Sequence, residues 1–439
     1  MKSAFKIFCL IIFVLFTALS SFSHPVSSSA FSNDDIKGTW EGTLSVQLRL
    51  VFRFYNSESG YLKAEMDSPD QKVYGLHLDT VIFDGSNIML KLNMASAYYE
   101  GKYNPDSIAF DGNWNQNGLK LPLTIKKVDK VEEIKLLRES GKTAPLDPDE
   151  VSIIVNGCKL AGTLKVPKAD HPVDVALIIA GSGPTDRDGN NPLIPGKNNS
   201  LKMISELLYN NNIASLRYDK RDVGASDKVK ESDLTFDTYI NDAVEWDRYL
   251  KKDKRFSKII IIGHSEGALI GMIAAERVGI QKYVSLCGAG EPAYLTLERQ
   301  IKNNKLSQEM LNRYTSMIDS LRDGYTLKDV DSSDFMLFRP SLQPYLISWF
   351  KYDPCKEISK LTIPVLIIEG TTDLQVTVRD AELLTKAATN SKLVIVENMN
   401  HVLKDVPTIN RAANFKTYGN PDLPLSEKFT EALLEFLKQ

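Results

Sequence analysis

The stretch that decides the fold reads Ile259-Ile260-Ile261-Ile262-Gly263-His264-Ser265-Glu266-Gly267. Four successive isoleucines predict a strand that is buried on both faces, and the small residues of Gly267–Ala275 predict a helix directly after it. A serine between such a strand and helix sits at the tip of a sharp, strained turn. Glycine fills the positions two residues either side of it, because a side chain there would clash. Ser265 is therefore the candidate nucleophile.

Strand-like and helical stretches alternate around this element, over residues 151–439. Uninterrupted apolar runs are typical of strands that helices cover on both faces, so we expect a doubly wound, mostly parallel α/β sheet. The spacing of apolar residues in Thr235–Lys251 predicts an amphipathic helix. Residues 291–350 interrupt the alternation, with Tyr294–Leu321 helical, and we expect them to form a lid over the carboxyl ends of the strands. The predicted strands are Val175–Ala180, Ile213–Tyr218, Lys258–Gly263, Tyr283–Cys287, Val365–Glu369 and Lys392–Val396.

Residues 31–128 have a different pattern, in which apolar and polar residues alternate. Over residues 44–54 six apolar side chains fall on every second position, which predicts one strand with a single apolar face. Turn signals separate further short runs, so we expect a small all-β antiparallel domain, either a sandwich or a barrel. Residues 129–150 are charged, contain two prolines and predict a linker or a short helix. The further strands predicted are Val73–Leu78, Val81–Phe83, Ile88–Leu92 and Leu121–Ile125.

The first 23 residues have the composition of a secretory signal peptide. Lys2 and Lys6 precede the apolar run Ile7–Phe16, and small and polar residues follow it. That run is shorter than the roughly 20 residues that a membrane-spanning helix needs. We therefore expect export to the periplasm or the medium, with no membrane span once the signal is cleaved. An uncleaved N-terminal anchor is the alternative.

The composition excludes several classes of protein. Hydrophobic residues make up 43% of the 439 residues and charged residues 25%, which is ordinary for a globular protein. The chain carries 53 Lys and Arg against 56 Asp and Glu, so the formal net charge is −3 and nothing predicts a nucleic-acid partner. Cys158, Cys287 and Cys355 remain after the signal, which permits at most one disulfide.

A serine nucleophile needs a base, and that base needs an acid to orient it. The chain has five histidines, and His401 is the one on a loop after a late strand of the predicted sheet. Asp373 follows the strand Val365–Glu369 and lies between Ser265 and His401 in the chain. The order serine, aspartate, histidine is the one found where the serine stands on such a turn between a strand and a helix. Glu369 is a rival acid at the end of that strand. The other histidines lie at the cleavage site, in the β domain, before the first strand of the sheet and next to the serine: His24, His77, His171 and His264.

Negative charge that develops on a substrate carbonyl oxygen needs hydrogen-bond donors. One candidate is the backbone N–H of Glu266, directly after the nucleophile, and the other comes from the loop after the strand Val175–Ala180. In that loop Ser182 or Gly183 could present an N–H group, and we favour Ser182. The stretch Asp186–Asn190 is similar to a calcium-binding loop but lacks its glycine and glutamate, so we expect no metal there.

These motifs resemble those of the α/β-hydrolase superfamily and, more narrowly, those of bacterial carboxylesterases related to the serine aminopeptidase group. The resemblance covers about residues 151–439, and the β domain resembles a module that is fused to the N-terminus of such hydrolases. Two positions depart from the family: Ala180 stands where many members have histidine, and Ala268 where a third glycine is common. The stretches that carry the resemblance are Gly181–Asn190, Arg217–Arg221, Gly263–Gly267, Asp353-Pro354, Gly370–Val376, Gly38–Gly42 and Asp67–Gln71.

The sequence therefore predicts an exported serine hydrolase that cleaves a small-molecule ester or another short acyl substrate through an acyl-enzyme on Ser265. This chemistry requires no cofactor and no metal. One alternative is a peptidase of the same fold, in which acidic lid residues such as Glu291, Glu298 and Glu309 would recognise a free amine. Another is a protein that binds a lipid or glycan through its β domain. The sequence leaves the oligomeric state open.

Overall fold

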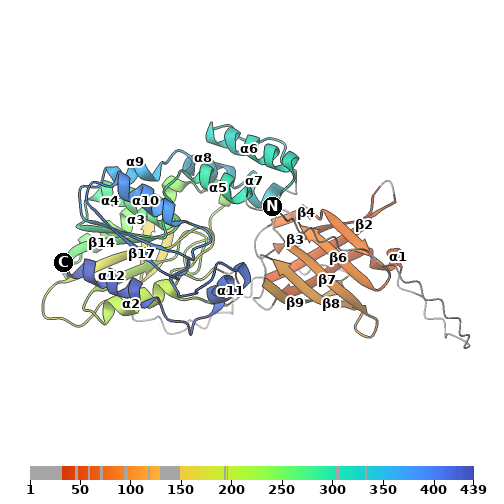
Figure 1. Cartoon of the computed structure of the whole chain (residues 1–439), viewed down its shortest axis with the longest axis horizontal. Coiled ribbons are helices and arrows are strands. Elements are labelled where there is room, and N and C mark those ends of the chain that lie inside the picture. The colour runs from red at the N-terminus through yellow and green to blue at the C-terminus, as the bar shows by residue number, and fades with distance from the viewer. Residues whose placement is uncertain are drawn as a thin grey trace, which may run out of the picture.

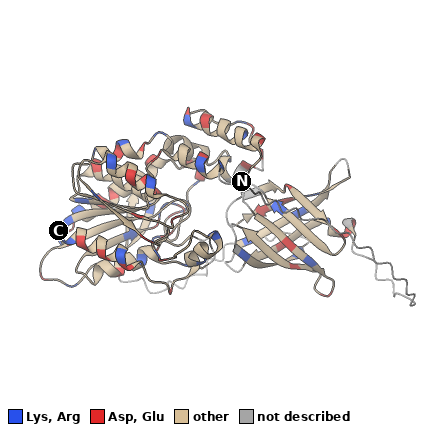
Figure 2. Ribbon diagram, viewed as in Figure 1, with Lys and Arg blue, Asp and Glu red and all other residues tan. Residues whose placement is uncertain are grey.

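A computed structural model describes residues 32–44, 48–57, 60–69, 73–92, 97–116, 119–128, 149–191, 194, 196–302, 306–331 and 334–439. The chain forms two separate sheets, one of nine strands and one of eight, each with its own core (Figure 1). The predicted signal peptide and residues 129–148 of the predicted linker lie outside the described residues. Basic and acidic residues are interspersed along the ribbon in both halves of the molecule (Figure 2).

The N-terminal sheet is antiparallel throughout, in the order β4-β3-β2-β1-β9-β8-β7-β6-β5. One face encloses an aromatic core that includes Trp40, Phe52, Tyr99 and Phe110. The strands come close together: a Cβ at Gly112 would lie 2.1 Å from the carbonyl oxygen of Glu100. Before the sheet stands α1 (Asn33–Ile36), and the strands are β1 (Gly38–Leu44), β2 (Leu48–Asn56), β3 (Leu62–Ser68), β4 (Val73–His77), β5 (Thr80–Phe83), β6 (Asn87–Leu92), β7 (Ala97–Asn104), β8 (Ala109–Gln116) and β9 (Leu119–Val128).

The prediction of one continuous strand over residues 44–54 is wrong. Leu44 ends β1, Leu48 begins β2, and these two residues pair in an antiparallel register. The two leucines are four positions apart in the sequence, and both side chains lie on the buried face of the sheet. The alternation of apolar and polar residues is therefore the same on both sides of the hairpin. This explains why the pattern alone could not separate a hairpin from a strand.

The C-terminal sheet has the order β10-β11-β13-β12-β14-β15-β16-β17. Strands β13, β12, β14, β15, β16 and β17 are parallel to one another, as predicted, and the antiparallel hairpin β10–β11 extends the sheet. This hairpin was not predicted from the sequence, although Asn156 and Gly157 at its turn both have positive φ, which Asn-Gly favours. The strands are β10 (Glu150–Val155), β11 (Cys158–Lys165), β12 (Val173–Ile179), β13 (Ala214–Tyr218), β14 (Phe256–His264), β15 (Lys282–Leu286), β16 (Val365–Gly370) and β17 (Ser391–Val396).

Helices cover both faces of this sheet. Ile260 and Ile262 of β14 pack with α2 (Ser200–Tyr209) and α12 (Glu427–Lys438) in one core. Ile259 and Ile261, the alternate residues, pack with α3 (Phe236–Lys251), α4 (Glu266–Val278) and α10 (Val378–Ala387) in the other. Four successive isoleucines are thus buried because the strand is covered twice.

The described residues of the segment 291–350 include helices α5 to α8 and build a core of their own around Tyr314, Ile318 and Phe338. The helix predicted over Tyr294–Leu321 is two helices. This segment also lies beside the β domain, because α7 contacts β4 (Figure 1). Within the described residues no helix is both long and apolar enough to cross a membrane. The remaining helices are α5 (Ala293–Lys302), α6 (Gln308–Arg322), α7 (Phe335–Phe338), α8 (Gln343–Trp349), α9 (Pro354–Ser359), α11 (Arg411–Lys416), η3 (Glu231–Asp233) and η5 (Thr417–Gly419).

Candidate active site

Ser265 lies between the end of β14 and the start of α4, with φ 55° and ψ −122°. A non-glycine residue pays for this backbone conformation in strain, which concentrates at functional sites. The flanking glycines are required: a Cβ at Gly263 would lie 2.3 Å from the carbonyl oxygen of Gly267, and one at Gly267 would lie 2.4 Å from that of Ile179. The strand, turn and helix therefore present the serine at the carboxyl edge of the sheet.

His401 and Asp373 are in direct contact. Nδ1–H of His401 donates to Oδ2 of Asp373 over 2.6 Å, and both side chains are buried. The other carboxylate oxygen accepts the backbone N–H groups of Gln375, at 2.7 Å, and Val376, at 3.0 Å. Burial alone would raise the pKa of Asp373, but His401 and these hydrogen bonds outweigh it and lower the pKa. The aspartate is thus a charged acceptor that fixes the imidazole.

His264 connects this pair to the serine turn. Its Nε2–H donates to the backbone carbonyl of His401 over 2.7 Å, and the centroids of the two imidazole rings are 4.9 Å apart. Burial lowers the pKa of His264 to about 4, so the ring is neutral near pH 7. The sequence does not favour His264 as the base, and it does not predict this connecting contact. The only signal for it was its position next to Ser265.

Glu369, the rival acid, is fully buried and lies beside Asp373. It accepts the backbone N–H of Gly370 over 2.9 Å. Burial and the charge of Asp373 raise its pKa well above the usual range, which favours the protonated form. Asp373 is therefore the carboxylate that contacts His401, and Glu369 is a neutral neighbour.

The loop after β12 lies against the serine. A Cβ at Gly181 would stand 3.1 Å from Cβ of Ser265, so Ser182 follows a residue in contact with the nucleophile. The carbonyl of Gly181 accepts a hydrogen bond from Nζ of Lys220 over 2.6 Å. Ion pairs join this loop to β13 and the segment after it: Arg187–Asp219 is largely buried, whereas Asp188, the partner of Arg217, is one-third exposed. Arg221 of the same segment pairs with the buried Asp242 of α3.

Two groups of side chains could approach the spacing of a metal site. They are His264, Cys287 and His401, and Cys287, Glu369 and Asp373. His401 and Asp373 use the facing atoms for their own hydrogen bond, and burial raises the pKa of the Cys287 thiol well above its usual range. In the loop that is similar to a calcium site, Asp186 instead accepts the backbone N–H groups of Asp188 and Asn190. His401, Asp373 and Asp186 thus use side-chain atoms that could bind a metal for hydrogen bonds within the protein.

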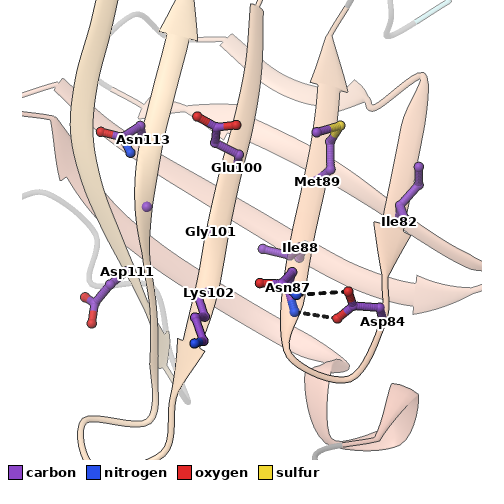
Figure 3. A pocket seen from close by; sticks show the side chains of 11 residues that line it. Ile82, Asp84, Asn87, Ile88, Met89, Glu100, Gly101, Lys102, Asp111 and Asn113 are labelled. Atoms are coloured by element: carbon purple, nitrogen blue, oxygen red, sulfur yellow. Dashed lines mark hydrogen bonds between the residues drawn. The ribbon is translucent and has the colours of Figure 1, made fainter. Parts of the chain in front are cut away.

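The β domain has a shallow depression on the outer face of β5, β6, β7 and β8 (Figure 3). Gly101 and Gly112 pair across β7 and β8 within it, and a Cβ at Gly101 would point to the inner face, 2.5 Å from the hydroxyl of Tyr99. Charges of both signs line it, including Glu100 and Lys102. The inner face of the same sheet is filled by the aromatic core.

The chain is similar in sequence to a known protein family and to curated enzymes. The sequence model of the family described as "Serine aminopeptidase, S33" matches residues 197–404, which include Ser265, Asp373 and His401. The chain is 31% identical to Esterase EstD of Thermotoga maritima over 265 residues, 59% of this chain and 61% of the esterase. It thus spans about three fifths of that relative's length.

A more distant relative is the proline iminopeptidase of Saccharolobus solfataricus, 25% identical over 244 residues, 47% of this chain and 76% of that protein. Among solved structures, Est1E of Butyrivibrio proteoclasticus with bound ferulic acid matches with a TM-score of 0.45 and 20% identity. That match covers 66% of this chain and all of Est1E.

Proposed function

From its confirmed resemblance to the α/β hydrolases of the esterase and aminopeptidase group, we propose that this chain is a serine hydrolase that cleaves carboxylic esters. The main observation in support of the proposal is the 2.6 Å hydrogen bond between Asp373 and His401. His264, next to Ser265, also forms a hydrogen bond with the backbone carbonyl of His401. These residues have the chemistry of a nucleophile, a base and an orienting acid.

In the proposed reaction, Oγ of Ser265 attacks the ester carbonyl while Nε2 of His401 takes the serine proton. Asp373 stabilises the imidazolium that forms, and the backbone N–H groups of Ser182 and Glu266 bind the developing oxyanion. The alcohol leaves with the proton from His401, and an acyl group remains on the serine. Water, deprotonated by His401, then releases the acid. The cycle requires no cofactor and no metal.

An ester fits the site better than the free amine of a peptide. An aminopeptidase needs an unpaired carboxylate near its site, and two of the three glutamates Glu291, Glu298 and Glu309 are paired: Glu291 with Arg299 and Arg379, and Glu298 with Lys302. Glu266, directly after the serine, is also paired, with Lys220. The peptidase remains the second candidate because the matching family model carries that description.

The proposal includes the organisation of the chain. Residues 1–23 would be a signal peptide that directs export, 31–128 a β domain, 129–150 a linker and 151–439 the hydrolase domain, with residues 291–350 as its lid. Contact between α7 and β4 supports a role for the β domain near that lid. A ligand for the β domain would meet the depression of Figure 3.

The test is hydrolysis of p-nitrophenyl esters with acyl chains of two to twelve carbons by the wild type and Ser265→Ala. We expect turnover of the shorter esters and a fall in kcat of about 10⁴-fold or more in the variant. Ser257→Ala, an exposed serine at the other end of β14, is the matched control. A folded wild type that cleaves aminoacyl amides and no ester would favour the peptidase, and activity that survives in Ser265→Ala would refute the nucleophile.

A further inference from the structure

Lys220 is a buried lysine whose two hydrogen-bond acceptors, Gly181 and Glu266, both belong to the proposed oxyanion region. It follows β13, and its side chain is only 2% exposed. Its Nζ donates to the carbonyl of Gly181 over 2.6 Å and lies 3.4 Å from Oε1 of Glu266. Lysine is almost never buried to this extent unless it is paired, because desolvation of the ammonium is costly.

The contact with Gly181 fixes a peptide group next to the nucleophile. The carbonyl of Gly181 and the N–H of Ser182 belong to one peptide plane and, in a trans peptide, point in opposite directions. A bond from Lys220 to that carbonyl therefore turns the Ser182 N–H away from the lysine. Because Gly181 lies against Ser265, this peptide is close to the reacting atoms.

The contact with Glu266 reaches the residue that would supply the second donor. Oε1 of Glu266 faces Lys220, and Oε2 accepts the hydroxyl of Tyr345 over 2.5 Å. Tyr345 is in α8, within the segment 291–350, so the carboxylate links that segment to the serine turn. Burial raises the pKa of Tyr345, which keeps its hydroxyl a donor.

We propose that Lys220 is a positioning residue that aims the Ser182 and Glu266 N–H groups at the substrate's carbonyl oxygen, with Tyr345 coupling the helical segment to it through Glu266. The inference rests on the proposed ester hydrolysis. Lys220 should therefore affect kcat more than KM. The reason is that the negative charge on the carbonyl oxygen is larger in the transition state than in the ground state.

The experiment compares Lys220→Met with the double variant Lys220→Met/Glu266→Gln, using p-nitrophenyl acetate. A buried glutamate without its lysine destabilises the fold, whereas removal of both charges leaves neither unpaired. We expect the double variant to regain stability toward urea while its kcat stays about 10²–10³-fold below wild type, with KM changed less than threefold. Recovery of wild-type kcat in the double variant would mean that Lys220 only neutralises Glu266, and would overturn the proposal.

Two further variants complete the test. Lys282→Met removes another buried lysine that donates to backbone carbonyls, those of Phe436 and Leu437, and should leave kcat unchanged. Tyr345→Phe removes one hydrogen bond to Glu266 and should lower kcat several-fold, while unchanged kcat would refute the coupling through Tyr345. A wild type without esterase activity would instead refute the proposed function, and an active wild type with a fully active Lys220→Met would refute this inference alone.

Discussion

Both sheets bury apolar residues, the N-terminal sheet on one face and the C-terminal sheet on two, but the two domains differ more sharply in their buried polar and charged residues. In the described part of the β domain the buried polar residues are Asp67, Ser68 and Asn115. The α/β domain buries a far larger set, and several of its members lie where strands of the sheet end, among them Glu369, Asp373 and Lys220. Because a buried charge costs free energy unless it is paired, this concentration sets the α/β domain apart from the β domain.

The largest expected effect compares two buried aspartates, one in each domain. Asp373→Asn should lower kcat for p-nitrophenyl acetate about 10⁴-fold, because an amide no longer stabilises the imidazolium or selects the correct tautomer of His401. Asp67→Asn is the matched variant: Asp67 pairs with Arg53 and accepts the N–H of Gly75. It should reduce stability and leave kcat unchanged. Equal losses of kcat in both variants would mean that the buried aspartate of the α/β domain has no special role in turnover.

The next effect concerns a buried ion pair away from the reacting atoms. Arg221 donates two hydrogen bonds to Asp242, whose side chain is completely buried. Arg221→Met leaves that carboxylate without its partner and should cost about 3–5 kcal/mol in urea unfolding. Arg221→Met/Asp242→Leu should recover most of the loss. A single variant as stable as the wild type would show that the network around the loops is not structural.

The sequence predicted the parallel sheet better than the β domain, for a physical reason. A strand covered on both faces is apolar at every position, as in Ile259–Ile262, and such runs are unambiguous. An alternating pattern survives a hairpin whose ends are an even number of residues apart, so Leu44 and Leu48 looked continuous. The hairpin β10–β11 was missed because its outer strand is partly exposed, with Ile154 among the exposed residues.

The candidate site was predictable where chain order carries the signal. Ser265, Asp373 and His401 each follow a strand, and parallel strands end at one edge of the sheet. Contacts between residues with no motif were not predictable. The bond from Lys220 to Gly181 joins positions 39 residues apart, and the bond from His264 to His401 joins positions 137 apart. Both depend on how the loops fold back, which no local pattern encodes.

A third prediction concerns pH and the histidine that connects the serine turn to His401. The pKa of His264 falls from 6.5 to about 4 on burial, so the unfolded chain binds a proton that the folded chain does not between these values. Titration of His264 therefore does not reduce the free energy of unfolding above pH 6.5. As the pH falls from 6.5 toward 4, it lowers the free energy of unfolding by about 3 kcal/mol. His264→Gln should flatten the pH dependence of urea unfolding in that window by this amount. His77→Gln, an exposed histidine of the β domain, is the control. Identical slopes for His264→Gln and the wild type would contradict the assignment.

The smallest effect belongs to an ion pair at the surface of the β domain. Lys120 and Glu100 lie 3.0 Å apart, but their side chains are 60% and 40% exposed, so water already solvates both charges. Lys120→Met should therefore change the free energy of unfolding by less than about 1 kcal/mol, and salt should change it little further. The contrast with Arg221→Met isolates burial as the variable, since both variants replace one cation of a pair with methionine. A loss of several kcal/mol from Lys120→Met would mean that pairing itself, and not burial, sets the cost. The separation of the two domains by buried charge would then fail.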